Sequence, residues 1–233
     1  MPIGRVYQAR PFSLGQIPMH GPYTKIFNLL QLMMAQKKPF PFVLEDLQET
    51  IVGWTFVSEI QFYEVPAKNE NLGEDIDSNL RLVSYPPPLA NGTAGLPRIV
   101  ADIYIGDHLC PIEMRWASFK ECCQIIWADL PDTYSVSDPD LQVLLHGLLF
   151  ERSTGGAPTS PPLLSEQFAR LCALELLFPF GERLRWYDAF KNNQVTAQEL
   201  SGMFAVPERI VRHLMDLHDV YVRIWGPLYR LKP

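Results

Sequence analysis

Three segments rich in β-branched and aromatic residues follow one another between residues 55 and 105, and the rest of the chain mostly shows helical spacing of apolar residues. The predicted strands are residues 55–65, 80–85 and 98–105. The predicted helices nearest to them are residues 25–38, 44–54 and 113–128. Strands that are grouped rather than interleaved with helices are typical of an α+β fold. We therefore predict a small sheet of about three strands with helices packed on one side.

The composition indicates a globular chain of one or two domains, because 47% of its 233 residues are hydrophobic and 20% are charged. No run of 18 apolar residues is present, and the first residues contain no apolar core of a signal peptide. The four cysteines lack C-x-x-C spacing. These features predict a cytoplasmic protein that does not enter membranes. The formal net charge of -6 argues against nucleic-acid binding by the whole surface.

The segment RWASFKECCQIIW, residues 115–127, has the spacing of a zinc-protease helix without its histidines. In the H-E-x-x-H signature two histidines bind zinc and the glutamate is the general base. Lys120, Glu121 and Gln124 occupy those three positions here. A protonated lysine cannot bind zinc, glutamine is a poor ligand, and a catalytic site needs about three protein ligands. Without zinc, Glu121 would have no activated water to deprotonate.

Four segments, in order, resemble the ImmA/IrrE-type zinc metallopeptidases. The helix RWASFKECCQIIW keeps the arginine, aromatic, glutamate and trailing apolar positions of that family's R-F-T-L-A-H-E-L-G-H-L-L-L. The segment EQFARLCALELLFP, residues 166–179, is similar to the family's E-x-x-A-N-x-F-A-x-x-L-L-M-P. Weaker similarities are ELSGMFAVPERIVRHL, residues 199–214, and PFVLEDLQETIVGW, residues 41–54. The resemblance covers roughly residues 24–215.

The resemblance implies a zincin-like minimal metallopeptidase fold in which the zinc ligands are lost. It places such a domain at residues 24–180, after an extended arm (1–23) and before a C-terminal helical hairpin and tail (181–233). Glu166 corresponds to the family's third zinc ligand, and Lys120 and Gln124 replace the two histidines. The expected molecule is a pseudo-peptidase without a cofactor.

Loss of the metal would leave Glu121 and Glu166 to repel each other, or one of them to bind a proton. The Lys120 ammonium can replace the cation and form a Lys–Glu pair that holds the two helices in register. The alternative is that Lys120 points to solvent.

Two other sources of metal ligands are less favoured. His146 lies 20 residues before Glu166, but its register offers one histidine and no base. The side chains of Cys122 and Cys123 diverge by about 100 degrees on a helix, which opposes joint ligation. We interpret both cysteines as small buried hydrophobic residues.

The segment from Thr196 to Leu214 predicts two short helices around a turn, similar to a helix-turn-helix. Thr196 and Glu199 have the spacing of a capping box. Arg209, Arg212 and His213 are the candidate DNA contacts on the second helix. Glu208 and Asp216 flank them, and the interpretation we favour is a supporting element rather than a DNA-binding one.

The leading hypothesis is a non-catalytic regulatory or protein-binding module in phage, mobile-element or stress regulation, with a repressor-type protein as its partner. One alternative is an atypical zinc-dependent endopeptidase that cleaves such a repressor. Another is a DNA-binding transcriptional regulator that acts through the C-terminal hairpin. The last residues are expected to be extended, and their aromatic side chains are expected either to pack on their own domain or to bury against another chain: Tyr221, Trp225 and Tyr229.

Overall fold

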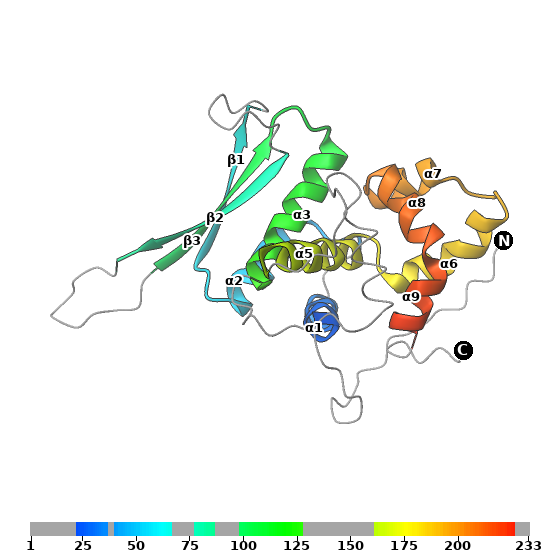
Figure 1. The fold of residues 1–233 in the computed structure, drawn as a ribbon, viewed down its shortest axis with the longest axis horizontal. Helices are drawn as coiled ribbons and strands as arrows, with labels where there is room; N and C mark the ends of the chain where they lie inside the picture. The colour runs from blue at the N-terminus through cyan, green and yellow to red at the C-terminus, as the bar shows by residue number, and fades with distance from the viewer. Residues whose placement is uncertain (1–21, 37–39, 67–76, 87–97, 128–160, 227–233) are drawn as a thin grey trace.

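The described part of the chain has an α+β fold in the computed structural model (Figure 1). The described residues are 22–36, 40–66, 77–86, 98–127 and 161–226. They form eight helices and one three-stranded sheet. The elements are α1 (Pro22–Ala35), α2 (Leu44–Trp54), β1 (Glu59–Val65), β2 (Ser78–Tyr85), β3 (Arg98–Gly106), α3 (Pro111–Trp127), α5 (Pro161–Leu177), α6 (Phe180–Lys191), α7 (Ala197–Phe204), α8 (Glu208–Asp216) and α9 (His218–Trp225).

The sheet has the order β1-β3-β2, in which β3 pairs in parallel with β1 and antiparallel with β2. Alternate residues of β3 point to opposite faces. Ala101, Ile103 and Ile105 belong to the hydrophobic core on the face that α3 covers. On the other face, Tyr63 and Tyr85 are exposed. The sheet therefore contributes one face to the core.

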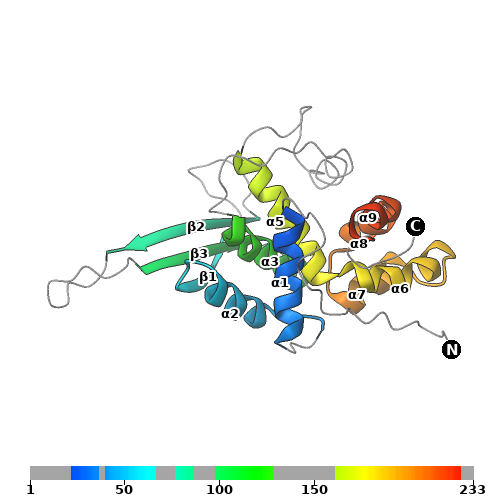
Figure 2. The same ribbon diagram turned by 90° about the horizontal axis from the view of Figure 1, so that it is seen from below.

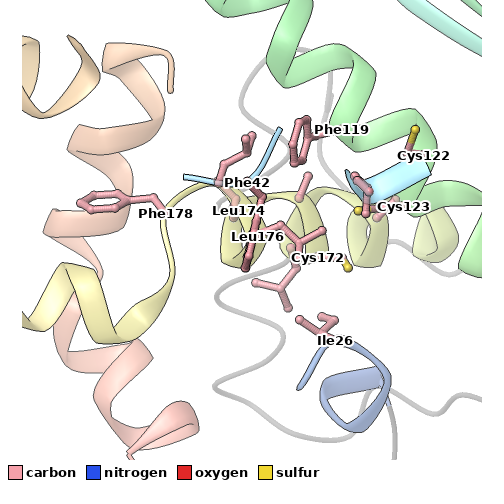
Figure 3. Close-up of a cluster of buried hydrophobic side chains, with 14 of the residues drawn as sticks. Ile26, Phe42, Phe119, Cys122, Cys123, Cys172, Leu174, Leu176 and Phe178 are labelled. Atoms are coloured by element: carbon pink, nitrogen blue, oxygen red, sulfur yellow. The ribbon is translucent and has the colours of Figure 1, made fainter. Parts of the chain in front are cut away.

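Helix α3 lies between the sheet and α5, and α1 packs on α5 in turn (Figures 1 and 2). Small buried side chains, alanines and cysteines, line α3 and α5: Ala117, Cys122 and Cys123 on α3, and Ala169, Cys172 and Ala173 on α5. Figure 3 shows the cysteines of the two helices within this core. Because both sides of α3 are covered, side chains on most of its circumference are buried, including polar ones.

Arg115 of α3 connects two distant parts of the chain. Its guanidinium donates hydrogen bonds to the Phe42 carbonyl oxygen at 2.6 Å and to the Phe204 and Ala205 carbonyl oxygens at 3.3 and 3.1 Å. Ala205 ends α7 in the left-handed conformation, with φ of 50°. Arg115 therefore holds the start of α2 and the end of α7 against α3.

The capping box predicted for Thr196 and Glu199 is present at the start of α7. The Glu199 backbone N–H donates to Thr196 Oγ1 at 3.2 Å, and the Thr196 N–H donates to Glu199 Oε2 at 2.7 Å. The hydrogen bonds that the Thr196 N–H and hydroxyl donate to the Glu199 carboxylate hold the pKa of that carboxyl below its usual value. The two reciprocal bonds satisfy backbone donors that would otherwise lack partners in the first turn.

Some predicted boundaries differ from the structure. The end of the expected N-terminal arm is helical, because α1 begins at Pro22, and residues 1–21 lie outside the described part. Strand β1 begins at Glu59, since α2 continues to Trp54 and is followed by a short turn.

The expected extended tail from Tyr221 onward is wrong for its first residues, because α9 continues to Trp225. Tyr221 and Trp225 are spaced by four residues and are both buried in the core. Burial of this helical stripe outweighs the low helix propensity of the β-branched and aromatic residues around it. Tyr229 lies outside the described residues.

The predicted division at residues 180 and 181 stays a prediction. One buried hydrophobic cluster runs from Ile26 in α1 to Trp225 in α9, and the tilted rings of Phe178 and Phe204 pack together with centroids 4.4 Å apart. The two predicted parts therefore share a core.

We expect Trp225→Ala to lower the free energy of unfolding by about 3–5 kcal/mol, because it removes a large buried side chain. The matched change Trp54→Ala, at a side chain that is 39% exposed, should cost about 1 kcal/mol or less. Urea titrations of both variants followed by circular dichroism would measure the difference. Equal losses would contradict the packing of α9 in the core.

Candidate functional site

The sequence-predicted site residues come from two helices that pack together. Lys120, Glu121 and Gln124 lie on α3, and Glu166 lies near the start of α5. Lys120 is 13% exposed and Glu121 is 2% exposed, whereas Gln124 is half-buried. The sheet and α5 enclose this part of α3, so these polar side chains cannot all reach bulk water.

The Lys120 ammonium lies beside both carboxylates. Its Nζ is 2.8 Å from Glu121 Oε1 and 3.8 Å from Glu166 Oε1. The expected Lys–Glu pair is present, and the alternative of a solvent-directed Lys120 is wrong. A buried carboxylate requires a nearby positive charge or hydrogen-bond donors, because burial removes its hydration. Lys120 supplies that charge to two helices at once.

Ser78, at the start of β2, completes this group. Its Oγ donates a hydrogen bond of 2.6 Å to the same Glu121 Oε1 that contacts Lys120. Within the described part of the chain, the buried Glu121 Oε2 has no hydrogen-bond partner. One oxygen of the carboxylate is therefore held by the sheet and by α3.

Arg170 is one helical turn after Glu166 and donates to Glu166 Oε1 at 2.7 Å. In the resembled family an asparagine takes this place. Two cations, Lys120 and Arg170, thus face two carboxylates, Glu121 and Glu166. The local charge is balanced without a metal ion.

The structure brings no metal-binding set together among the residues it describes. No group of three or more histidine, cysteine, aspartate and glutamate side chains gathers in these ranges. The candidate ligand His146 lies outside these ranges. The expected absence of zinc stays a prediction.

The cysteines of α3 are buried, as the sequence predicted. Burial raises the pKa of the Cys122 thiol, and the Glu121 charge adds to this effect. Burial also raises the pKa of Cys123, as does its hydrogen bond with Cys172 of α5. Thiols that stay protonated are poor metal ligands and poor nucleophiles. Cys110, just before α3, is exposed.

A cleft of about 710 Å³ opens beside Lys120. Helices α3 and α8 form its main walls. Arg170 of α5 and the start of β2 contribute polar groups, and Leu109 contributes an apolar side chain. Its apolar lining consists of Leu109, Trp116, Ala117 and Ile210. Its charged lining consists of Asp77, Glu113, Lys120, Arg170, Arg209, Arg212 and Asp216. The cleft therefore has apolar surface among charges of both signs.

The three candidate DNA contacts line this same cleft rather than a separate surface. Arg209 Nη1 is 2.5 Å from Glu113 Oε1 of α3, and Arg212 Nε donates to Glu208 Oε1 at 3.0 Å. Burial lowers the pKa of His213, which outweighs the opposite effect of Asp216. DNA phosphates would have to compete with carboxylates for both arginines, and the histidine favours its neutral form.

The sequence interpretation missed Ser78 and the role of Arg170. Ser78 follows an acidic segment and carries no spacing signature, so only the strand register places it beside Glu121. The Arg170–Glu166 contact could have been predicted, because Arg170 follows Glu166 by four residues, a spacing that brings side chains together on a helix.

Comparison with protein-family models, curated proteins and solved structures finds no match to this chain. None of the helices in the described ranges has the length and apolar character needed to cross a membrane.

We expect Lys120→Ala to lower the free energy of unfolding by about 3 kcal/mol, because it leaves the buried Glu121 carboxylate without its cation. For a chain of this size the melting temperature should fall by about 6–12 °C. Differential scanning calorimetry would measure the shift.

Arg212→Ala is the matched control, because it removes one partner of an exposed ion pair and should cost about 0.5 kcal/mol or less. An unchanged melting temperature for Lys120→Ala would show that the pair contributes nothing to holding α3 and α5.

We expect the double variant Lys120→His, Gln124→His to bind one zinc ion per chain, with Glu166 as the third ligand. Metal analysis after gel filtration would measure the stoichiometry. Adding Glu166→Ala should abolish binding. Zinc retained in that triple variant would place the ligands elsewhere and contradict the predicted arrangement.

Proposed function

We propose that this chain is a catalytically inactive, peptidase-like regulatory module that binds a protein partner in the cleft between α3 and α8. The observation that carries the proposal is the position of the Lys120 ammonium between Glu121 and Glu166 at the wall of that cleft. Lys120 and Glu166 correspond to two of the zinc-ligand positions of the resembled family, and Glu121 corresponds to its general base.

The ammonium can replace the charge of a metal ion but not its chemistry. Zinc activates a bound water and polarises the carbonyl group because it has a vacant coordination position. A lysine ammonium has none. Glu121 Oε1 already accepts a hydrogen bond from Ser78 and forms an ion pair with the Lys120 ammonium. These contacts support a site that keeps its structure while the groups needed for hydrolysis are absent.

The order of elements supports the proposed zincin-like fold. Helix α3 follows an inner strand of the sheet, and α5 brings Glu166 to α3. Helices α7 and α8 follow with a short connection, which supports the helix-turn-helix-like arrangement. Arg115, whose place in the motif agrees with the resemblance, connects α3 to the end of α7.

The lining of the cleft supports a polypeptide ligand. Strand β2 is an edge strand of the sheet and begins at the cleft with Ser78. An edge strand can pair with an extended segment of another protein. Trp116 and Ile210 offer apolar contacts there. A repressor-type regulator, which the resemblance implies, would bind through such an extended segment.

The two alternative functions have weaker support. A zinc endopeptidase needs ligands that the described residues do not bring together. A DNA-binding regulator needs a basic surface, whereas Arg209 and Arg212 contact carboxylates of the same chain.

Random dodecapeptides displayed on phage would test the proposal. We expect selection on the purified protein to yield peptides that bind in the cleft, so that Ile210→Asp weakens a synthetic selected peptide at least about tenfold, or 1.4 kcal/mol. Fluorescence polarisation would measure the affinity. The matched control Met203→Asp changes an exposed residue of α7 outside the cleft and should leave binding unchanged.

The selected peptide should remain uncut after incubation with the protein and zinc, as judged by mass spectrometry. Zinc-dependent cleavage would support the endopeptidase instead. An unchanged affinity of the selected peptides for the Ile210→Asp variant would contradict the assignment of the cleft as the binding site.

A further inference from the structure

The junction between α5 and α6 contains a buried ion pair. Helix α5 ends at Leu177 and α6 begins at Phe180, so only two residues separate them. Glu175 is 0% exposed and Arg183 is 1% exposed. Arg183 Nη2 is 2.5 Å from Glu175 Oε1, and the Phe180 backbone N–H donates to Glu175 Oε2 at 3.0 Å. The pair therefore bridges the two helices across their junction.

Arg183 also contacts the junction itself and a third helix. Its Nη1 donates to the Phe178 carbonyl oxygen at 2.6 Å. Its guanidinium lies 4.4 Å from the centre of the Tyr221 ring on α9. A planar guanidinium can make these directed contacts simultaneously, which a lysine ammonium cannot. One side chain thus fixes the relative positions of α5, the junction and α9.

The helix before this junction lines the cleft, and the helix after it packs on a wall of the cleft. Helix α5 carries Arg170, while α8 carries Arg209 and His213 and packs on α6. Figure 1 shows α6, α7, α8 and α9 grouped beside α5, away from the sheet. Across the cleft, the Arg209–Glu113 ion pair is partly exposed, with the Arg209 side chain 52% exposed. An exposed pair holds two helices weakly.

Burial makes the contacts at the junction energetically costly to break. Burial raises the pKa of the Glu175 carboxyl, and the adjacent Arg183 charge opposes that rise. Moving either group away from the other would leave an uncompensated charge in the core, which is strongly unfavourable. The junction is therefore resistant to bending as long as both groups are present.

We propose that Arg183 is a positioning residue of the cleft: it fixes the angle between α5 and α6 and, together with the Arg115 contacts to the end of α7, holds α8 at a set distance from α3 in the absence of any ligand. The cleft is then pre-formed. This inference depends on the cleft geometry and holds whether or not the cleft binds a partner protein.

The distribution of distances between two spin labels, measured by pulsed electron paramagnetic resonance, would test this proposal. One label goes on Cys110, which is exposed, while the other three cysteines are buried. The second goes on Gly202→Cys in α7, where a Cβ atom meets nothing within 4 Å. Helix α7 packs on α8, so this label follows the α8 wall. We expect one narrow distance distribution in the parent protein.

Arg183→Lys keeps the positive charge but cannot contact Glu175, Phe178 and Tyr221 together. We expect a broader distribution with a longer mean distance.

Leu47→Ala is the control, because it removes a buried leucine of α2 and lowers stability away from the junction. Its distance distribution should therefore stay narrow. Arg183→Met is a second variant, expected to broaden the distribution further where it folds. An unchanged distribution in Arg183→Lys, or equal broadening in Leu47→Ala, would overturn the proposal. Peptide binding is measured separately, so its failure would not affect this result.

Discussion

The packing of α3 between the sheet and α5 is the constraint on which the rest of the structure depends. A helix covered on two sides must bury most of its circumference, and α3 carries Glu121 among its buried positions. Burial of a carboxylate without compensation costs several kcal/mol. Ser78 and Lys120 provide the compensation, and Lys120 extends it to Glu166 on the neighbouring helix. The charge arrangement at the site is thus a consequence of the packing of one helix.

The same constraint governs the charges at this site. Two carboxylates that come close together on packed helices have to be neutralised. A lysine does this within the existing packing, because its ammonium reaches both carboxylates from α3. The shape of the adjacent cleft then depends on other contacts, namely Arg115 at the end of α7 and Arg183 at the α5–α6 junction. The shape of the cleft and the charge compensation are therefore determined by different residues.

Much of the fold could be predicted from local patterns. Helix α2 has the predicted bounds, β3 and α3 differ by one or two residues at an end, and the capping box of α7 is present. These are features that spacing and local hydrogen bonding decide. The prediction failed at α9, where β-branched and aromatic residues indicated an extended tail. There the burial of Tyr221 and Trp225 against other helices decides the conformation, and no local pattern contains that information.

The sequence by itself determined the positions of most of the helices and strands, the presence of Lys120, Glu121 and Gln124 on one helix, and the spacing of Glu166 and Arg170 on one helix face. These follow from residue type and periodicity along the chain. Only the tertiary structure decided that Lys120 lies between two carboxylates, that Ser78 contacts Glu121, and that Arg209 and Arg212 line the same cleft as Lys120. The physical reason is that the Lys120–Glu166 and Ser78–Glu121 contacts and the walls of the cleft join elements that are far apart in the chain. The distances between these residues are set by how the sheet, α3, α5 and α8 pack. Glu175 and Arg183 also lie on different helices. An acidic residue in an apolar helix indicates a buried partner, but it does not show which residue that partner is.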